Sequence, residues 1–100
     1  MMYSIHFRPR ATTDIKSVYD HIEYELFSPI SAQRFIEGLY AKIDRLKYSA
    51  DAFAISTYKD VLKYDADARH VTYKGFAIIY SIYDDLVLIH RVIHGSHIKG

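Results

Sequence analysis

Five side chains in the last third of the sequence are of types that bind and cleave phosphodiesters. Arg69 and Arg91 are cations that suit phosphate, and His94 and His97 titrate near neutral pH and can therefore transfer protons. Lys99 adds a further cation beside the histidines. Cleavage of RNA through its own 2′-hydroxyl needs a base, a cation for the phosphate and an acid. Arg69, His94 and His97 are thus the candidate catalytic set of a metal-independent endoribonuclease, and Arg91 and Lys99 are candidate target-binding residues.

The histidines His90, His94 and His97 also have the residue type of a zinc site. On a helix, residues four apart are neighbours, but on a strand that rises about 3.3 Å per residue His90 and His94 stand about 13 Å apart, which is too far to share one ion. The sequence contains no cysteine and no glycine loop of the kind that cradles phosphate. We therefore expect neither a metal nor a cofactor.

Two of the candidate catalytic residues have structural interpretations as well. Arg69 follows Asp65 and Asp67 closely in the chain, so an ion pair with one of them competes with a substrate contact. His94 precedes Gly95 at the predicted end of a strand, where a histidine can serve simply as a hydrogen-bonded structural group. Both interpretations stay open for each residue.

Arg91 lies in a segment that alternates like a strand. Strict alternation places three aliphatic residues on its face: Val87, Ile89 and Ile93. A cation among such neighbours needs a counter-charge, because burial of an unpaired charge is costly. We expect an acid from a helix, such as Asp14 or Asp20, to hold Arg91, and we expect His94 to face the other way with Leu88, His90 and Val92.

Composition limits the size and class of the protein. The sequence has 100 residues, of which 50% are hydrophobic, and this suffices for one core but not for two. Residues 1–100 are therefore expected to form a single domain. The net charge is only +1, and no apolar run approaches the roughly 20 residues that span a bilayer. With no cysteine to form disulfides, we expect a soluble, cytoplasmic protein without a membrane partner.

The first half of the sequence predicts one strand and two helices. Residues 3–7 alternate apolar and polar, and Pro9 ends the strand. A helix capped by Thr12 or Thr13 is expected to run to Ser28 and Pro29. Ser31 is the expected cap of a second helix, and the short connection predicts an antiparallel helical hairpin.

The second half predicts a sheet. Residues 48–67 have no clear pattern and are expected to be irregular, with apolar pieces that cover the core. From Arg69 the segments are rich in Val, Ile and Tyr, and Asp84-Asp85 indicates a turn. Phe76 to Tyr83 is apolar almost throughout, which indicates a central strand covered on both faces. The predicted class is α+β in the order β-α-α-β-β-β, an antiparallel sheet with the helical hairpin packed on one face and the first strand at or near an edge.

With these elements in place, the sequence resembles a known family, the RelE/ParE toxins of type II toxin-antitoxin systems, also called plasmid stabilisation proteins. The resemblance covers nearly the whole chain. Its most specific parts are Arg69, the run Phe76 to Tyr80 and the ending Ile89 to Gly95. The supporting positions are the strand at residues 3–7 with Ala11 and Asp14, and the helical pattern Ala32, Phe35, Leu39, Ile43 and Leu46. The resemblance implies a toxin that a cognate antitoxin neutralises in a hetero-oligomeric complex.

The resemblance leaves two mechanisms open. The ParE-like branch binds and inhibits DNA gyrase, whereas the RelE-like branch cleaves mRNA on the ribosome. Relatives in the second branch generally have further basic groups beyond the last strand, whereas this sequence has only His97 and Lys99 there. We therefore favour a ParE-like toxin that inhibits gyrase or another replication factor, with the ribonuclease as the alternative and a non-toxic interaction module as a third possibility.

The second predicted helix has a wide apolar stripe. Its members are Phe35, Ile36, Leu39, Tyr40, Ile43 and Leu46. A single seam against a sheet needs fewer positions than this. The hypothesis is that an amphipathic antitoxin helix docks on part of the stripe.

Overall fold

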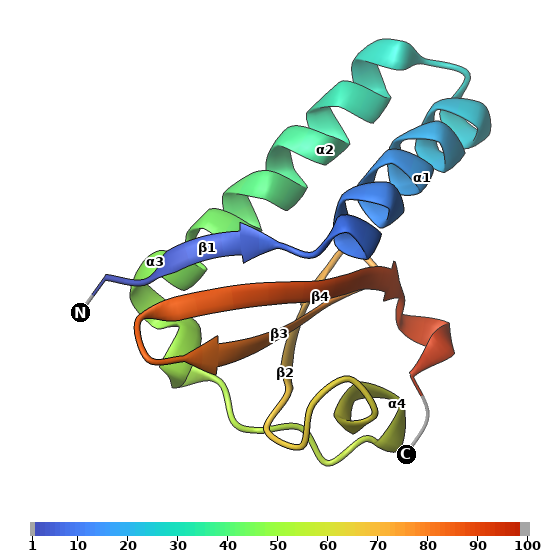
Figure 1. The fold of residues 1–100 in the computed structure, drawn as a ribbon. Coiled ribbons are helices and arrows are strands. Elements are labelled where there is room, and N and C mark those ends of the chain that lie inside the picture. Colours follow the sequence, from blue (N-terminus) through green and yellow to red (C-terminus); the bar gives the residue numbers. More distant parts are fainter. Residues whose placement is uncertain (1, 99–100) are drawn as a thin grey trace.

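The computed structural model describes residues 2–98, and they form a four-stranded sheet with a helical hairpin on one face (Figure 1). The strands are β1 (Ser4–Phe7), β2 (Arg69–Tyr73), β3 (Phe76–Tyr83) and β4 (Leu86–His94), and the long helices are α1 (Pro9–Leu26) and α2 (Pro29–Asp44). Short helical segments follow as α3 (Leu46–Ser49), η1 (Ala50–Ala52), α4 (Lys59–Leu62) and η2 (Gly95–His97). The α+β class and the element order are as predicted. None of the described helices is long and apolar enough to cross a membrane.

Helix α1 starts earlier than expected. Pro9 occupies its first turn and Arg8 is its N-cap residue, with no hydrogen bond from the Arg8 side chain to the helix. The predicted caps Thr12 and Thr13 are therefore inside the helix, and the Thr13 hydroxyl donates to the Pro9 carbonyl. Proline suits the first helical position because its missing N–H would have no partner there, and this starts the helix one turn before the threonines.

The second helix is also capped one turn earlier than predicted. The Ser28 hydroxyl accepts a hydrogen bond from the backbone N–H of Ser31, and Pro29 stands in the first turn. Ser31 is thus the donor of the cap and not the cap itself. Since α1 ends at Leu26, the connection between the two helices is very short, and it turns through a left-handed residue, Phe27.

The sheet has the order β1-β4-β3-β2. Strands β2, β3 and β4 form the predicted antiparallel meander, and β1 is an edge strand as expected. However, β1 pairs with β4 in parallel, so the sheet is mixed and not fully antiparallel. The helical hairpin between β1 and the meander acts as the long crossover that a parallel pair requires.

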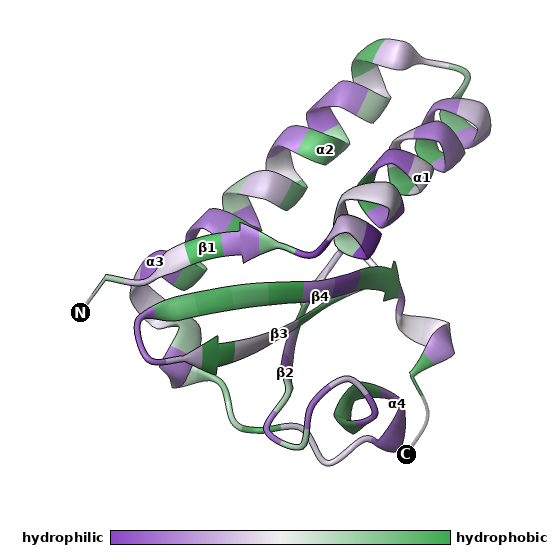
Figure 2. Cartoon of the chain, in the orientation of Figure 1, coloured by the Kyte–Doolittle hydropathy of each residue, from purple (hydrophilic) through white to green (hydrophobic). Residues whose placement is uncertain are grey.

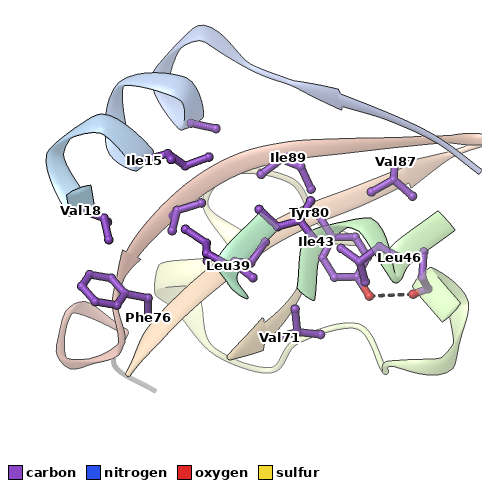
Figure 3. Close-up of a cluster of buried hydrophobic side chains, with 14 of the residues drawn as sticks. Ile15, Val18, Leu39, Ile43, Leu46, Val71, Phe76, Tyr80, Val87 and Ile89 are labelled. Atoms are coloured by element: carbon purple, nitrogen blue, oxygen red, sulfur yellow. Dashed lines mark hydrogen bonds between the residues drawn. The ribbon is translucent and has the colours of Figure 1, made fainter. Parts of the chain in front are cut away.

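The core lies between the helical hairpin and the sheet (Figure 3). Tyr80 is fully buried there, and its hydroxyl donates to the Ala50 carbonyl at 2.7 Å. Burial raises the pKa of Tyr80 to about 12. A second cluster of Val61, Ala68 and Ile79 covers the opposite face. Strand β3 is therefore covered on both faces, as its sequence predicted. Residues 48–67 carry the expected covering pieces, but the prediction that they are irregular is wrong in part, because they contain the helical segments η1 and α4.

Candidate functional site

The candidate site is centred on Arg91, where β4 becomes irregular. In the register of β3 and β4, Ile79 pairs with Arg91 but Tyr80 pairs with Ile89, so His90 is an extra residue in a β-bulge. Strand β4 is hydrophobic towards both ends and hydrophilic between them (Figure 2).

The bulge changes which side chains share a face. Before it, Val87 and Ile89 join the core under the helices, and after it Val92 joins that core while Ile93 joins the opposite cluster. The prediction that Arg91 shares a face with Val87 and Ile89 is therefore wrong, although Ile93 stays on its face; likewise His94 follows Val92 to the helix side and does not share a face with Leu88 and His90. The extra residue reverses the alternation that the prediction assumed.

Asp14 of α1 holds Arg91, as the sequence suggested. The guanidinium donates twice to the carboxylate, from Nε to Oδ2 at 2.6 Å and from Nη2 to Oδ1 at 3.0 Å. The backbone N–H of Val92 also donates to Asp14, at 3.0 Å. Strand β1 ends at Phe7, so this edge N–H lies beyond its last pairing residue and the carboxylate takes the place of a strand partner. The hydrogen bond that Arg91 donates to Asp14 raises the pKa of Arg91.

Tyr64 lies beside this ion pair. Its hydroxyl accepts a hydrogen bond from Arg91 Nη1 at 3.2 Å, and its ring stacks on the His90 ring at 6.2 Å with an interplanar angle of 21°. The loop that carries Tyr64 falls in residues 48–67, where the sequence had no legible pattern, so no sequence signal pointed to this residue.

A surface hollow of about 380 Å³, here called the histidine groove, brings three of the predicted site residues together. Its lining includes Arg91, His94 and His97, together with His21, Tyr64 and Asp14. Among residues 2–98, no group of three or more acidic, histidine or cysteine side chains has the arrangement of a metal site.

Within the histidine groove, His94 has local partners. Its Nδ1 accepts from the backbone N–H of Ser96 at 3.2 Å and lies 2.8 Å from the Ser96 hydroxyl. Since Nδ1 is an acceptor, the proton of the neutral ring is on Nε2. The ring also meets Phe76 edge-on at 5.5 Å. These contacts hold the His94 ring at the end of β4. Its Nε2 lies on the side of the ring nearest Gly75.

Arg69 lies apart from the histidine groove. On β2 it is in register with Tyr80, whereas His94 is in register with Phe76 at the other end of β3. Its guanidinium donates to the carbonyls of Phe53 and Asp51. The ion pair with Asp65 or Asp67, which the sequence left open beside a substrate contact, is not among the ion pairs of residues 2–98, and carbonyls of the covering loop bind Arg69 instead. Lys99 lies outside the described residues.

His90 and Ser81 form a buried polar pair that sequence reasoning missed. The Ser81 hydroxyl lies 2.8 Å from His90 Nε2, and both side chains are buried. Burial lowers the pKa of His90, and the nearby charge of Arg8 lowers it further. The pair lies within the bulge, and the Tyr64 ring stacks on its histidine.

Comparison with known proteins identifies the family. The family model for the ParE toxin of the type II toxin-antitoxin system parDE matches residues 5–98. The chain belongs to the ParE toxin family. A solved structure described as the chromosomal ParDE TA system from P. aeruginosa has the same fold, with a TM-score of 0.74 and 20% identity over 93% of this chain and 96% of that chain. No curated protein gives a significant match to the sequence.

This ParE-family chain has a cluster of exposed apolar side chains at the tip of its helical hairpin. We define the hairpin tip as Tyr24, Leu26, Phe27 and Ile30, whose exposed fractions are 73%, 56%, 87% and 67%. Phe27 has φ 50° and ψ 35°, a left-handed conformation that favours glycine. Neither burial nor backbone geometry accounts for phenylalanine at this position.

A second apolar surface of this ParE-family chain lies between β1 and α2. This hollow of about 510 Å³, here called the edge groove, is lined by Ile5, Phe7, Tyr40, Ala41 and Ile43, with the charged residues Glu37, Asp44 and Lys47 along it. Most of the wide stripe predicted on the second helix is core: Leu39, Ile43 and Leu46 are buried, the last of them in α3, and Phe35 and Ile36 pack against the core. Tyr40 is the exception among the six stripe residues, at 44% exposed, and its ring meets Phe7 edge-on at 6.1 Å.

Proposed function

We propose that this toxin acts in the cytoplasm by binding and inhibiting DNA gyrase through the hairpin tip. The observation that carries the proposal is the nearly fully exposed Phe27 in a conformation that phenylalanine disfavours. Exposed aromatic residues on a rigid scaffold are typical anchors of protein interfaces, and an unfavourable backbone conformation that persists points to a function. Membership of the ParE family agrees with a toxin that acts by binding.

We also propose that the cognate antitoxin neutralises the toxin by docking an amphipathic segment in the edge groove. Tyr40 and Phe7 offer an apolar contact there, and the outer side of β1 is the edge of the sheet. An extended segment can pair with such an edge while its apolar side chains enter the neighbouring groove. The printed description of the P. aeruginosa neighbour, a ParDE system, agrees with a toxin-antitoxin hetero-oligomer.

Ribosome-dependent cleavage of mRNA is the second candidate function. The observation in its favour is that Arg91, His94 and His97 all line the histidine groove. Against it, Arg69 is separated from these residues and bound to carbonyls, and Asp14 neutralises Arg91. A cation that already has a bidentate carboxylate partner stabilises a transition-state phosphate less than a free one does.

Gyrase supercoiling assays with purified protein test the first proposal. We expect inhibition by the wild-type chain and by a His94→Ala variant, and loss of inhibition in Phe27→Gly. In cells, induction should produce gyrase-linked DNA breaks and no discrete cuts in transcripts. Transcript cuts that disappear in His94→Ala would instead establish the ribonuclease. Absence of both kinds of damage would identify a non-toxic interaction module.

A further inference from the structure

A third hollow adjoins the histidine groove, with which it shares Lys63, Tyr64 and Arg91, and most of its lining residues are basic. This basic cleft has a volume of about 300 Å³ and is formed by Arg8, Arg10, Lys63, Tyr64, His90 and Arg91. Its positive charges come from three separate parts of the chain: the start of α1, the end of α4 and the bulge of β4. The fold thus gathers into one concave place basic residues that the sequence keeps far apart.

The start of α1 adds to the positive character of the basic cleft. The helix has 18 residues, no acidic residue in its first turn and no side-chain cap. The positive end of the helix dipole favours an anion, and here Arg8 and Arg10 flank it. Pro9 has no N–H, and the N–H groups of Ala11 and Thr12 donate to the Arg8 carbonyl, so the two arginines, and not free helix N–H groups, supply the chemistry of a phosphate site.

The acids near the basic cleft have other partners. Asp14 is bound by Arg91 and by the Val92 N–H, and Asp65 accepts from the Tyr83 hydroxyl and the Asp67 N–H. Asp60 lies 4.0 Å from Lys63, a contact at the limit of an ion pair. Among residues 2–98, no ion pair involves Arg8 or Arg10, which are both exposed. Their charge is therefore available to an external anion.

We propose that the basic cleft binds the phosphodiester backbone of duplex DNA. The inference rests on the proposed function, because gyrase acts on duplex DNA and a toxin bound to gyrase would contact that DNA through this cleft. An acidic protein segment fits less well, since interfaces between proteins need apolar anchors and Tyr64 is the one aromatic side chain in the lining. The apolar surfaces of this toxin are the hairpin tip and the edge groove, which serve its protein partners.

Fluorescence anisotropy with the purified chain and a labelled 20-base-pair duplex tests the proposal. The test variant is Arg8→Glu/Arg10→Glu, and the control is Arg34→Glu, a like change at an exposed residue of α2 that does not line the cleft. Acids at the start of α1 suit the helix dipole, so the test variant should melt no lower than wild type. We expect it to bind DNA at least tenfold more weakly at 50 mM salt, while Arg34→Glu loses less than threefold.

The salt dependence gives an independent measure. Removal of two phosphate contacts should reduce the slope of log affinity against log salt by about 1.8. Equal binding by all three proteins, no binding by the wild type at 50 mM salt, or tighter binding to polyglutamate or single-stranded RNA than to the duplex would each overturn the proposal. A gyrase pull-down without DNA measures the proposed function separately, since it depends on the hairpin tip and not on Arg8 and Arg10.

Discussion

Replacement of Phe27 by glycine separates binding at the hairpin tip from folding. The left-handed conformation costs a residue with a β-carbon roughly 1–2 kcal/mol, and glycine removes that cost. Glycine in turn loses about 0.5–1 kcal/mol through the greater entropy of the unfolded chain. The ring is 87% exposed, so its burial contributes only about 0.2–0.4 kcal/mol of the 1.5–3 kcal/mol available to a buried side chain.

The ring of Phe27 also contacts Tyr24, with centroids 6.2 Å apart, and this exposed pair contributes at most about 0.5 kcal/mol. The opposing contributions nearly cancel, so the stability of Phe27→Gly should lie within about 1 kcal/mol of wild type. For a domain of this size, the melting temperature should then change by no more than about 4–8 °C.

Binding should respond much more strongly than stability. An aromatic anchor of an interface contributes about 2 kcal/mol or more, so Phe27→Gly should weaken gyrase binding about 30-fold or more, measured by surface plasmon resonance on immobilised gyrase. Tyr48→Ala is the matched control, because Tyr48 is 72% exposed on α3 and lies away from the tip. Unchanged gyrase affinity in Phe27→Gly, with a normal melting temperature, would refute the assignment of the hairpin tip.

Three further predictions concern the buried polar contacts. Tyr80→Phe should lower the free energy of unfolding by about 1–2 kcal/mol in urea titrations, since it leaves a buried carbonyl without its donor. Asp14→Ala should cost about 2–4 kcal/mol, because it leaves Arg91 without its counter-ion, whereas removal of an exposed partner such as Asp44 should cost less than about 1 kcal/mol. Burial lowers the pKa of His90 below 6.5, so the unfolded chain binds more protons and stability should fall as the pH drops below about 6.5, less steeply in His90→Gln.

A second histidine also contributes to the pH dependence of stability. Burial also lowers the pKa of His70, so His90→Gln should reduce the slope of stability against pH without abolishing it. Each proton contributes at most about 1.4 kcal/mol per pH unit, and the partial exposure of His70 makes its share of the slope smaller. A slope that is the same in wild type and His90→Gln would show that the Ser81–His90 pair does not titrate as described.

The periodic parts of the sequence predicted the fold well. The apolar run of β3 and the helical stripes were sufficient because burial on a regular element repeats at the period of that element. The caps of the two helices were placed too late, since Pro9 and Pro29 start each helix before the hydroxyl residues that sequence reasoning chose. The parallel pairing of β1 with β4 depends on the path of the chain after the helical hairpin. The local pattern of residues 3–7 does not encode that path.

The candidate site was harder to predict than the fold. The pairing of Arg91 with Asp14 could be foreseen, because a cation in an apolar strand requires an acid within reach. The contacts of Arg69 with loop carbonyls could not, since they depend on the path of residues 50–53 across the sheet edge. Tyr64 has no neighbouring motif, and its role depends on the fold of a segment without periodicity.

The bulge at His90 explains why the basic residues meet where they do. Without the extra residue, the alternation that places Val87 and Ile89 under the helices would place Arg91 there too, within the apolar core. With it, Val92 fills that place and Arg91 lies at the edge beyond β1, within reach of Asp14. At the same edge the chain leaves β1 and enters α1. Arg8 and Arg10 therefore lie beside the bulge and line one cleft with His90 and Arg91. One inserted residue therefore both preserves the core and assembles the basic cleft.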